Sequence, residues 1–217
     1  MQTWAVIAQK GGQSKTTLAT GFAVEAAREG ATVVILDADD RQGSALYWSE
    51  RRELDDVTVK DSSVAGLPLH VSRGRASGKI DLIIIDTPAN SKDIAMLAAE
   101  QADFAIIPVA PRGLDVHSVL QTVKQVQQAG TPFAVILTQV PHQGGEEEEA
   151  RMGFASKGIT LFDTRLHFRK DYYKATPIGR TAVELEPNGK ASAELRAAYN
   201  EAKRLSGYTT KQINEVA

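Results

Sequence analysis

Short, almost entirely apolar runs recur along the N-terminal part of the chain, separated by segments with a different apolar spacing. Five runs of four to six residues are rich in β-branched side chains, which is typical of strands buried on both faces: Thr3–Ala8, Thr32–Leu36, Leu82–Ile85, Phe104–Val109 and Phe133–Thr138. The segments between them repeat apolar residues at helical spacing: Thr16–Arg28, Ser91–Glu100 and Val116–Ala129. This alternation predicts an α/β fold, a three-layer sandwich in which a doubly wound, mostly parallel sheet has helices on both faces.

The pattern changes from about Gly144 onward. Residues 146–149 are glutamates, which favour the solvated first turn of a helix over an interaction tract, because acidic side chains suit the positive end of a helix dipole. A polar, basic stretch follows, and the last predicted helix runs from Lys190 to about Leu205. The length fits one domain, residues 1–217, whose C-terminal part from about residue 151 is basic and helical.

The composition narrows the chemistry that the chain can perform. It has 25 basic and 27 acidic side chains, a net charge of −2, and no cysteine. Cysteine-bound zinc, iron–sulfur clusters and thiol nucleophiles are therefore excluded, and the four histidines show no metal-ligand spacing, so a catalytic metal would need oxygen ligands. We expect a cytoplasmic protein with no membrane attachment, since the chain opens on no signal-peptide pattern and the tail from Leu205 to Ala217 has little apolar surface.

A phosphate-binding loop is the strongest chemical signal. Gln9 to Thr17 read QKGGQSKTT, after a predicted strand and at the start of a predicted helix. Glycines let backbone N–H groups turn toward an anion, and the helix N-terminus adds its positive dipole end. Lys15 supplies a point charge, and Thr16 offers a hydroxyl to Mg²⁺. Because Gln9 and Ser14 replace the glycines of the general pattern G-x-x-x-x-G-K-[ST], a glycine-rich turn with two solvated lysines is the alternative.

Carboxylates follow two of the predicted strands. Asp37 and Asp39 follow the run that begins at Val33, and Asp86 follows the run 82–85. The carboxyl ends of these strands should meet at the edge of the sheet that carries the phosphate loop, where acidic groups need a cation. One aspartate at a strand end often only caps the next turn. Two such ends beside a phosphate loop favour a hydrolase.

The string Lys10-Gly11-Gly12-x-x-Lys15-Thr16-Thr17, with its second lysine ahead of Lys15, resembles the deviant Walker A motif of the ParA/MinD family of ATPases. Residues 37–39 and 86–88 are similar to further segments of that family. The resemblance is closest to small ParA-type plasmid or chromosome partition ATPases without an N-terminal helix-turn-helix. It implies the fold of a P-loop NTPase, ATP or ADP with Mg²⁺ as cofactors, and hydrolysis of ATP to ADP and phosphate.

The same resemblance implies a role for each matching residue. The nucleotide would be bound by Lys10, Gly11, Gly12, Gln13, Ser14, Lys15, Thr16 and Thr17. Lys10 would reach across a homodimer interface to the partner's nucleotide, and Lys10, Lys15 and Asp39 would be catalytic, with Asp39 orienting or deprotonating the attacking water. Thr16 and Asp86 would hold Mg²⁺, with Asp37 behind them.

Two segments depart from the family pattern. The family usually has glycine where this chain has Ser14, so we expect either a backbone there that is not strongly left-handed or a shifted loop. After Asp39 the chain continues Asp40-Arg41-Gln42-Gly43-Ser44, one residue longer than the usual segment and without its proline.

Two further predictions concern segments that follow later strands. The stretch from Ile106 to Asp115 is similar to a family segment that leads into a helix at the dimer face, and Asp115 either caps that helix or contacts nucleotide. The guanine-reading string Asn-Lys-x-Asp is absent, which favours adenine. We expect the base near Gln139 to Pro141.

The near-neutral total charge hides an asymmetry. Residues 1–150 hold 13 basic and 20 acidic side chains, a net of −7, whereas residues 151–217 hold 12 and 7, a net of +5. A basic cluster interleaved with aromatic residues suits contacts to a phosphate backbone, although a solvated basic surface is the alternative. The cluster predicted to bind DNA comprises Arg165, Arg169, Lys170 and Lys174.

The resemblance also implies partners and leaves alternatives. An ATP-bound homodimer would bind nonspecific DNA, associate with the nucleoid, and release DNA when a small centromere-binding partner protein stimulates hydrolysis. A ParA/MinD-like ATPase that positions a protein assembly is the second hypothesis. A P-loop kinase acting on a small molecule, with no need for Lys10, is the third.

Overall fold

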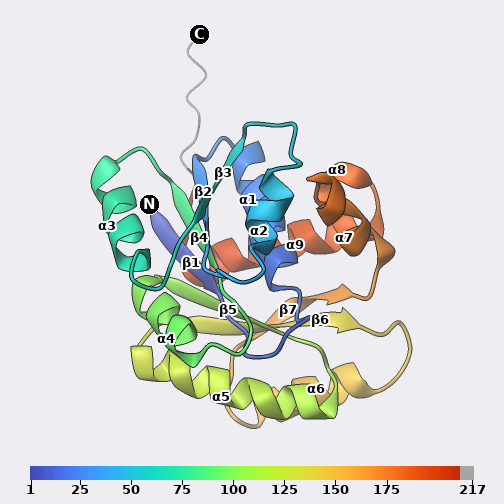
Figure 1. The fold of residues 1–217 in the computed structure, drawn as a ribbon. Coiled ribbons are helices and arrows are strands. Elements are labelled where there is room, and N and C mark those ends of the chain that lie inside the picture. The colour runs from blue at the N-terminus through green and yellow to red at the C-terminus, as the bar shows by residue number, and fades with distance from the viewer. Residues whose placement is uncertain (211–217) are drawn as a thin grey trace.

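The computed structural model describes residues 1–210, and for residues 114–117 it describes the backbone alone. Within this part of the chain, seven strands form one sheet in the order β3-β2-β4-β1-β5-β6-β7, and every pair of neighbours is parallel (Figure 1). The strands are β1 (Gln2–Val6), β2 (Val33–Asp37), β3 (Val57–Asp61), β4 (Leu82–Asp86), β5 (Phe104–Val109), β6 (Phe133–Val140) and β7 (Leu161–His167).

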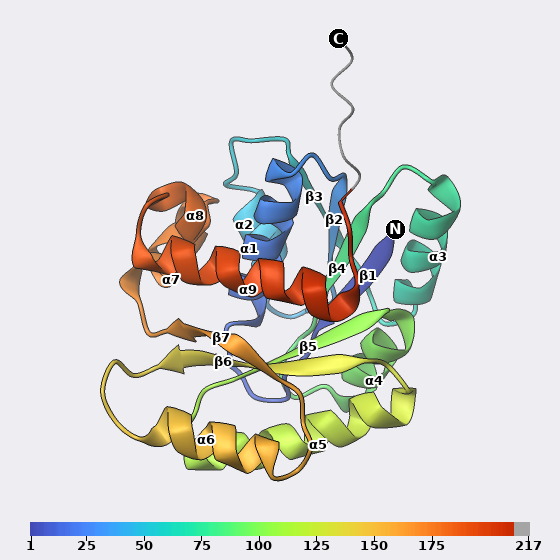
Figure 2. The same ribbon diagram turned by 180° about the vertical axis from the view of Figure 1, so that it is seen from behind.

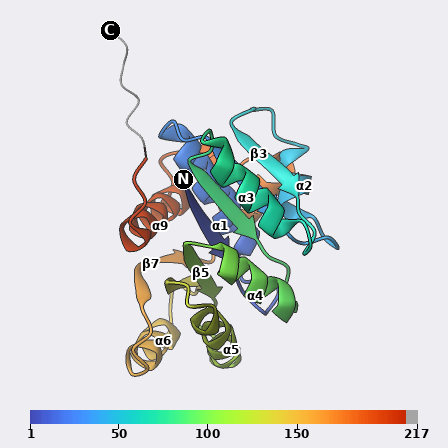
Figure 3. The same cartoon turned by 90° about the vertical axis from the view of Figure 1, so that its left-hand side faces the viewer.

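Helices cover both faces of the sheet, as the views from behind and from the side show (Figures 2 and 3). One face carries α1 (Lys15–Arg28), α2 (Ser44–Ser49), α7 (Lys170–Ala175), α8 (Ala182–Leu185) and α9 (Lys190–Ser206), with a short 3₁₀ turn, η1 (Thr176–Ile178), between α7 and α8. The other face carries α3 (Leu67–Ser77), α4 (Lys92–Gln101), α5 (Gly113–Ala129) and α6 (Glu146–Ala155). The predicted fold class is confirmed.

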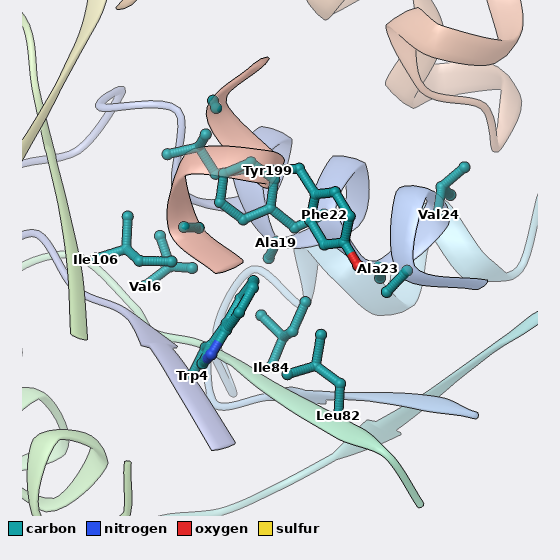
Figure 4. Close-up of a cluster of buried hydrophobic side chains, with 14 of the residues drawn as sticks. Trp4, Val6, Ala19, Phe22, Ala23, Val24, Leu82, Ile84, Ile106 and Tyr199 are labelled. Carbon is teal, nitrogen blue, oxygen red and sulfur yellow. The ribbon is translucent and has the colours of Figure 1, made fainter. Parts of the chain in front are cut away.

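Side chains of the central strands alternate between two cores. Trp4 joins the core under α1 and α9, whereas its neighbour Ala5 joins the core under α4 and α5. Figure 4 shows the first core, where the Trp4 ring lies against Phe22 and Tyr199 with ring centroids 6.2 and 6.1 Å apart. Because β1 is buried on both faces, the loop that follows it starts from a rigid part of the molecule.

The sequence located most of these elements. The five predicted strands and four predicted helices are present, and the glutamates 146–149 form the first turn of α6 as expected. The prediction of a helix from Val116 was wrong at its start, because α5 begins at Gly113. Seven elements received no prediction of their own: α2, β3, α3, β7, α7, η1 and α8.

No helix within residues 1–210 is both long enough and apolar enough to cross a membrane. The expectation for the tail falls partly on residues 211–217, which lie outside the described residues. The side chain of Asp115, expected to cap a helix or to contact nucleotide, also lies outside them.

Candidate nucleotide-binding site

The predicted site residues meet at the carboxyl edge of the sheet. Strands β1, β4 and β2 are neighbours, and the register pairs Asp86 with Val6 on one side and with Asp37 on the other. The loop from Gln9 to Ser14 leaves β1 at this edge and enters α1. The parallel register therefore brings the carboxylates beside the phosphate loop, as the sequence predicted.

Neighbouring strand ends hold the loop in place. The buried side chain of Gln13 accepts a hydrogen bond from the backbone N–H of Ala110, at 2.6 Å. The hydroxyl of Thr138 donates to the Gln13 carbonyl at 3.4 Å, and the side-chain amide of Gln139 donates to the Gly12 carbonyl. The ends of β5 and β6 thus fix the loop before any ligand binds, which lowers the ordering cost of binding.

Ser14 has a left-handed backbone, with φ 63° and ψ 26°. The first alternative, a backbone that is not strongly left-handed, is therefore wrong, and a shifted loop is the alternative that stays a prediction. A non-glycine residue with this backbone carries strain of about 1–2 kcal/mol.

Asp86 and Thr16 form the centre of the candidate metal site. The Thr16 hydroxyl donates to Oδ2 of Asp86 at 2.6 Å, and the carboxylate is 2% exposed. Among the described residues, Oδ1 of Asp86 has no hydrogen-bond partner. A buried carboxylate oxygen without a partner is rare, and burial raises the pKa of Asp86 to about 7.

These residues fit Mg²⁺. A hydroxyl and one carboxylate, completed by water and phosphate oxygens, are the ligands that Mg²⁺ commonly takes beside a nucleotide. The described residues contain no group of three or more histidine, aspartate or glutamate side chains that could hold a metal by themselves. Thr16 and Asp86 therefore suit a cation whose remaining ligands are oxygens of phosphate and water.

Lys15 supplies the positive charge of the loop from a largely buried position. Its side chain is 9% exposed, and burial lowers its pKa, while the carboxylates of Asp86 and Asp39 act in the opposite direction. A cation held in a protein interior interacts strongly with an anion that replaces its lost hydration.

Asp37 braces the segment that follows β2. Its Oδ1 accepts from the backbone N–H of Asp39 at 3.1 Å, and its Oδ2 accepts from Ala45 and Leu46 at 2.8 and 3.0 Å. Burial raises the pKa of Asp37, although these N–H groups favour its ionised form. Asp37 therefore holds both the backbone of Asp39 and the first turn of α2.

Asp39 and Lys10 lie at the outer side of the site. Oδ1 of Asp39 accepts from the backbone N–H groups of Arg41 and Gln42 at 3.2 and 3.0 Å, so the lengthened segment folds back on Asp39. Asp39 lines a hollow of about 320 Å³, and the exposed Lys10 lines another of about 610 Å³. Asn90 lines both hollows, so two of the three predicted catalytic residues, Asp39 and Lys10, line neighbouring hollows.

A cavity of about 370 Å³ opens on the other side of the loop. Gly12, Ser14, Thr17 and Gln139 form one side of it, so one residue of the range expected to lie near the base does line a cavity. Its other side is lined by Leu166, His167, Phe168, Arg169, Tyr172, Tyr173, Thr176 and Pro177. Closely spaced aromatic residues are the signal in the sequence that could have indicated this wall, and the predicted DNA-binding cluster includes them without assigning them a pocket.

Within the described part of the chain, the basic cluster divides into ion-paired arginines and exposed lysines. The Arg169 guanidinium lies 2.6 Å from Glu194 with its side chain 15% exposed, and Arg165 lies 3.0 Å from Glu147. Lys170 and Lys174 are exposed on α7. The two lysines thus face solvent, whereas each arginine is engaged in an ion pair within the molecule.

The sequence profile of the CobQ/CobB/MinD/ParA nucleotide binding domain matches residues 4–180, and the chain belongs to this family. The resemblance to ParA and MinD is thereby confirmed, and the chain is a ParA/MinD-like ATPase.

Individual relatives agree with this assignment. Maintenance of carboxysome distribution protein A from Halothiobacillus neapolitanus is 27% identical over 214 residues, covering 92% of this chain and 95% of the relative. Protein ParA from Rhizobium radiobacter is 25% identical over 130 residues, or 59% of this chain and 57% of that protein. The structure of MinD from Pyrococcus horikoshii, complexed with Mg-ADP, has the same fold, with a TM-score of 0.80, 18% identity, and coverage of 95% of this chain and 97% of that one.

Proposed function

We propose that this chain binds ATP together with Mg²⁺, closes into a homodimer and hydrolyses the nucleotide. The observation that carries the proposal is the buried Oδ1 of Asp86, which has no hydrogen-bond partner among the described residues, beside the Thr16 hydroxyl and the buried ammonium of Lys15. The crystallised MinD relative holds Mg-ADP, which supports the same pair of ligands here.

Each residue of the site has a role that follows from its position. Backbone N–H groups of the loop and Lys15 would bind the phosphates, and Thr16 and Asp86 would hold Mg²⁺, which offsets the charge on the transferred phosphoryl group. Asp39, held by Asp37 through their shared segment, would orient the attacking water. The exposed Lys10 lines the open hollow of about 610 Å³, where a second subunit's phosphates would lie.

Sedimentation with ATP and Mg²⁺ tests this proposal. We expect the wild type to dimerise, Lys15→Ala to stay monomeric because it loses the phosphates, and Lys157→Ala, at an exposed site distant from the loop, to behave as wild type. Lys10→Ala should bind nucleotide but lose dimerisation and turnover. A wild type that stays monomeric in saturating ATP would contradict the proposed ATP-bound homodimer. Unchanged turnover in Lys10→Ala would favour a small-molecule kinase.

We propose nonspecific DNA binding as the output of the ATP-bound dimer, with a centromere-binding partner that stimulates hydrolysis. The exposed lysines of α7, Lys170 and Lys174, and the relative named ParA support this role. A role in positioning a protein assembly is the second candidate, because the relative that covers 92% of this chain is named for carboxysome distribution.

DNA mobility with ATP, with ADP and without nucleotide separates the two roles. We expect an ATP-dependent shift at low salt that is lost in Lys170→Glu/Lys174→Glu and kept in the control Lys157→Glu. Arg169→Glu is unsuitable, because it would place a second carboxylate against Glu194. Absence of any ATP-dependent shift would reject the DNA role and leave the protein assembly.

A further inference from the structure

The carboxylate of Glu194 on α9 joins several groups of the segment that follows β7. Its Oε1 accepts from Nη2 and Nε of Arg169 at 2.6 and 3.0 Å, and lies 2.7 Å from Nδ1 of His167. Its Oε2 accepts from the backbone N–H of His167 at 3.1 Å and from the hydroxyl of Tyr172 at 3.2 Å. One side chain thus holds three residues that follow one another closely in sequence.

Those three residues, His167, Arg169 and Tyr172, all line the 370 Å³ cavity beside the phosphate loop. Burial opposes ionisation of Glu194, but hydrogen bonds from Arg169 and His167 lower its pKa overall, so the carboxylate is charged at neutral pH. Removing this charge would leave the half-buried Arg169 without its counter-ion and release the backbone of His167.

We propose that Glu194 is a positioning residue for nucleotide binding: it orders, from α9, the wall against which the base of the nucleotide packs. The inference rests on the proposed function, which brings a nucleotide to the loop beside this cavity. Because the residues of this wall are already ordered before the nucleotide binds, less conformational entropy is lost on binding. Glu194 therefore sets nucleotide affinity and leaves the chemical step, at the opposite side of the loop, unchanged.

Glu201 is a matched control on the same helix. Its carboxylate accepts the backbone N–H groups of Asp163 and Thr164, at 2.8 and 2.9 Å, so it too ties α9 to β7. Neither of these residues lines the cavity. Replacing Glu201 removes a comparable contact between helix and strand without touching the proposed wall.

The test compares Glu194→Gln and Glu201→Gln in the full chain, using binding of Mg·ATP and of Mg·tripolyphosphate, which fills only the phosphate loop. For Glu194→Gln we expect about tenfold weaker binding of Mg·ATP, the size of one lost charged hydrogen bond, and unchanged binding of Mg·tripolyphosphate. KM for ATP should rise while kcat stays as in wild type. Glu201→Gln should change none of these values.

Further variants separate the possible outcomes. Arg169→Gln should weaken Mg·ATP as Glu194→Gln does, and the double variant should show no additional loss, because the two residues act as one unit. If Glu194→Gln does not fold, Glu194→Asp takes its place, since it keeps the charge but shortens the side chain. Wild-type affinity in the Glu194 variants, or equal losses for both ligands, would overturn the positioning role. A wild type that binds no ATP would overturn the proposed function itself.

Discussion

Ser14 shows how one residue can keep a loop geometry that its own side chain opposes. Its φ and ψ angles lie in the left-handed region, which the Cβ disfavours, and its hydroxyl makes no capping hydrogen bond among the described residues. The hydrogen bonds to Gly12 and Gln13, the two residues before Ser14, hold the loop and stabilise this backbone. The strain is therefore local to one residue.

We expect Ser14→Gly to stabilise the protein slightly. Relief of about 1–2 kcal/mol of strain is offset by about 0.5–1 kcal/mol from the greater freedom of glycine in the unfolded chain, so the gain is up to about 1.5 kcal/mol. Urea unfolding at constant m-value measures it. Ser14→Ala keeps the Cβ and should bring no gain; an equal gain in both variants would show that the Cβ is not the cause.

Asp86 makes the stability of the metal-free protein depend on pH. Its ordinary pKa of 3.8 rises to about 7 on folding because of burial, so the folded state binds a proton that the unfolded state has lost. The contribution of this group to stability is complete below its ordinary pKa and is lost as the pH rises through 7.

We expect Asp86→Asn to stabilise the metal-free protein by about 2–4 kcal/mol at pH 8 and by less than half as much at pH 5, where the folded protein keeps the proton and only the unfolded chain has lost it. Asparagine can still accept the Thr16 hydroxyl. Thermal unfolding in a chelator at the two pH values checks this. An effect of equal size at both would mean that the buried charge is not the source.

At the scale of elements, the sequence predicted the interior of the sheet and failed at its edges. The central strands are apolar throughout because both faces are buried, which a pattern reveals directly. The two edge strands, β3 and β7, alternate buried and exposed positions over a few residues, and such a pattern also occurs in loops. Helix α3 contains Pro68 and Gly74, which weaken a helical pattern although the tertiary packing overrides them.

The cavity wall was missed for a related reason. It depends on how β7, α7 and α9 pack together, and Glu194 meets His167 and Arg169 only in three dimensions. By contrast, the carboxylates at the ends of β2 and β4 were predictable, because parallel strands place their ends at one edge by rule.

One glycine fixes the approach of η1 to the end of α2. Gly179 has φ +68°, and a Cβ there would overlap the backbone of Arg51 and Arg52. Arg52 also donates to the Gly179 carbonyl at 3.0 Å. The two segments can dock only if position 179 has no side chain.

We expect Gly179→Ala to lower the free energy of unfolding by about 3 kcal/mol or more, through the left-handed backbone and the overlap together. Gly207 has the same φ of +68°, but no described atom lies within 4 Å of a Cβ there, so Gly207→Ala should cost only about 1 kcal/mol. Chemical denaturation of both variants gives the comparison. Equal costs would contradict the close docking.

At the scale of the whole molecule, the charge asymmetry along the sequence does not persist in space. Basic residues of the C-terminal part pair with acidic residues of the earlier helices, as in Arg165–Glu147, Arg196–Glu25 and Lys203–Glu29, at 3.0, 3.6 and 2.6 Å. Charge counts alone could not show this, because they carry no information on which helices meet. The cationic surface available for the proposed DNA binding is therefore smaller than the sequence suggested.

Carboxylates on α9 or in contact with it should also make the protein less stable at acidic pH. Burial opposes ionisation of Glu29, Glu194 and Glu201, but the hydrogen bonds that they accept lower the pKa of each. A depressed pKa contributes stability that is complete above the ordinary value of 4.5 and is lost as the pH falls below it. Asp86 acts with the opposite sign at higher pH.

We therefore expect the metal-free protein to be most stable near about pH 5, with losses on both sides. Denaturant unfolding from pH 3 to pH 8 measures the profile. Glu201→Gln should flatten the acid side only, and Asp86→Asn the other side only. A stability that keeps rising to pH 8 would contradict the assignment of these two groups.

Helix α9 also engages backbone donors of β7, an edge strand of the sheet. Strand β7 is the last strand at one edge of the sheet within the described residues, and the backbone N–H groups of Asp163, Thr164 and His167 donate to glutamates of α9. These donors are already engaged and are not available to a further strand. The two edges of the sheet are therefore unlike, and a partner that binds by adding a strand would find fewer free backbone donors at β7.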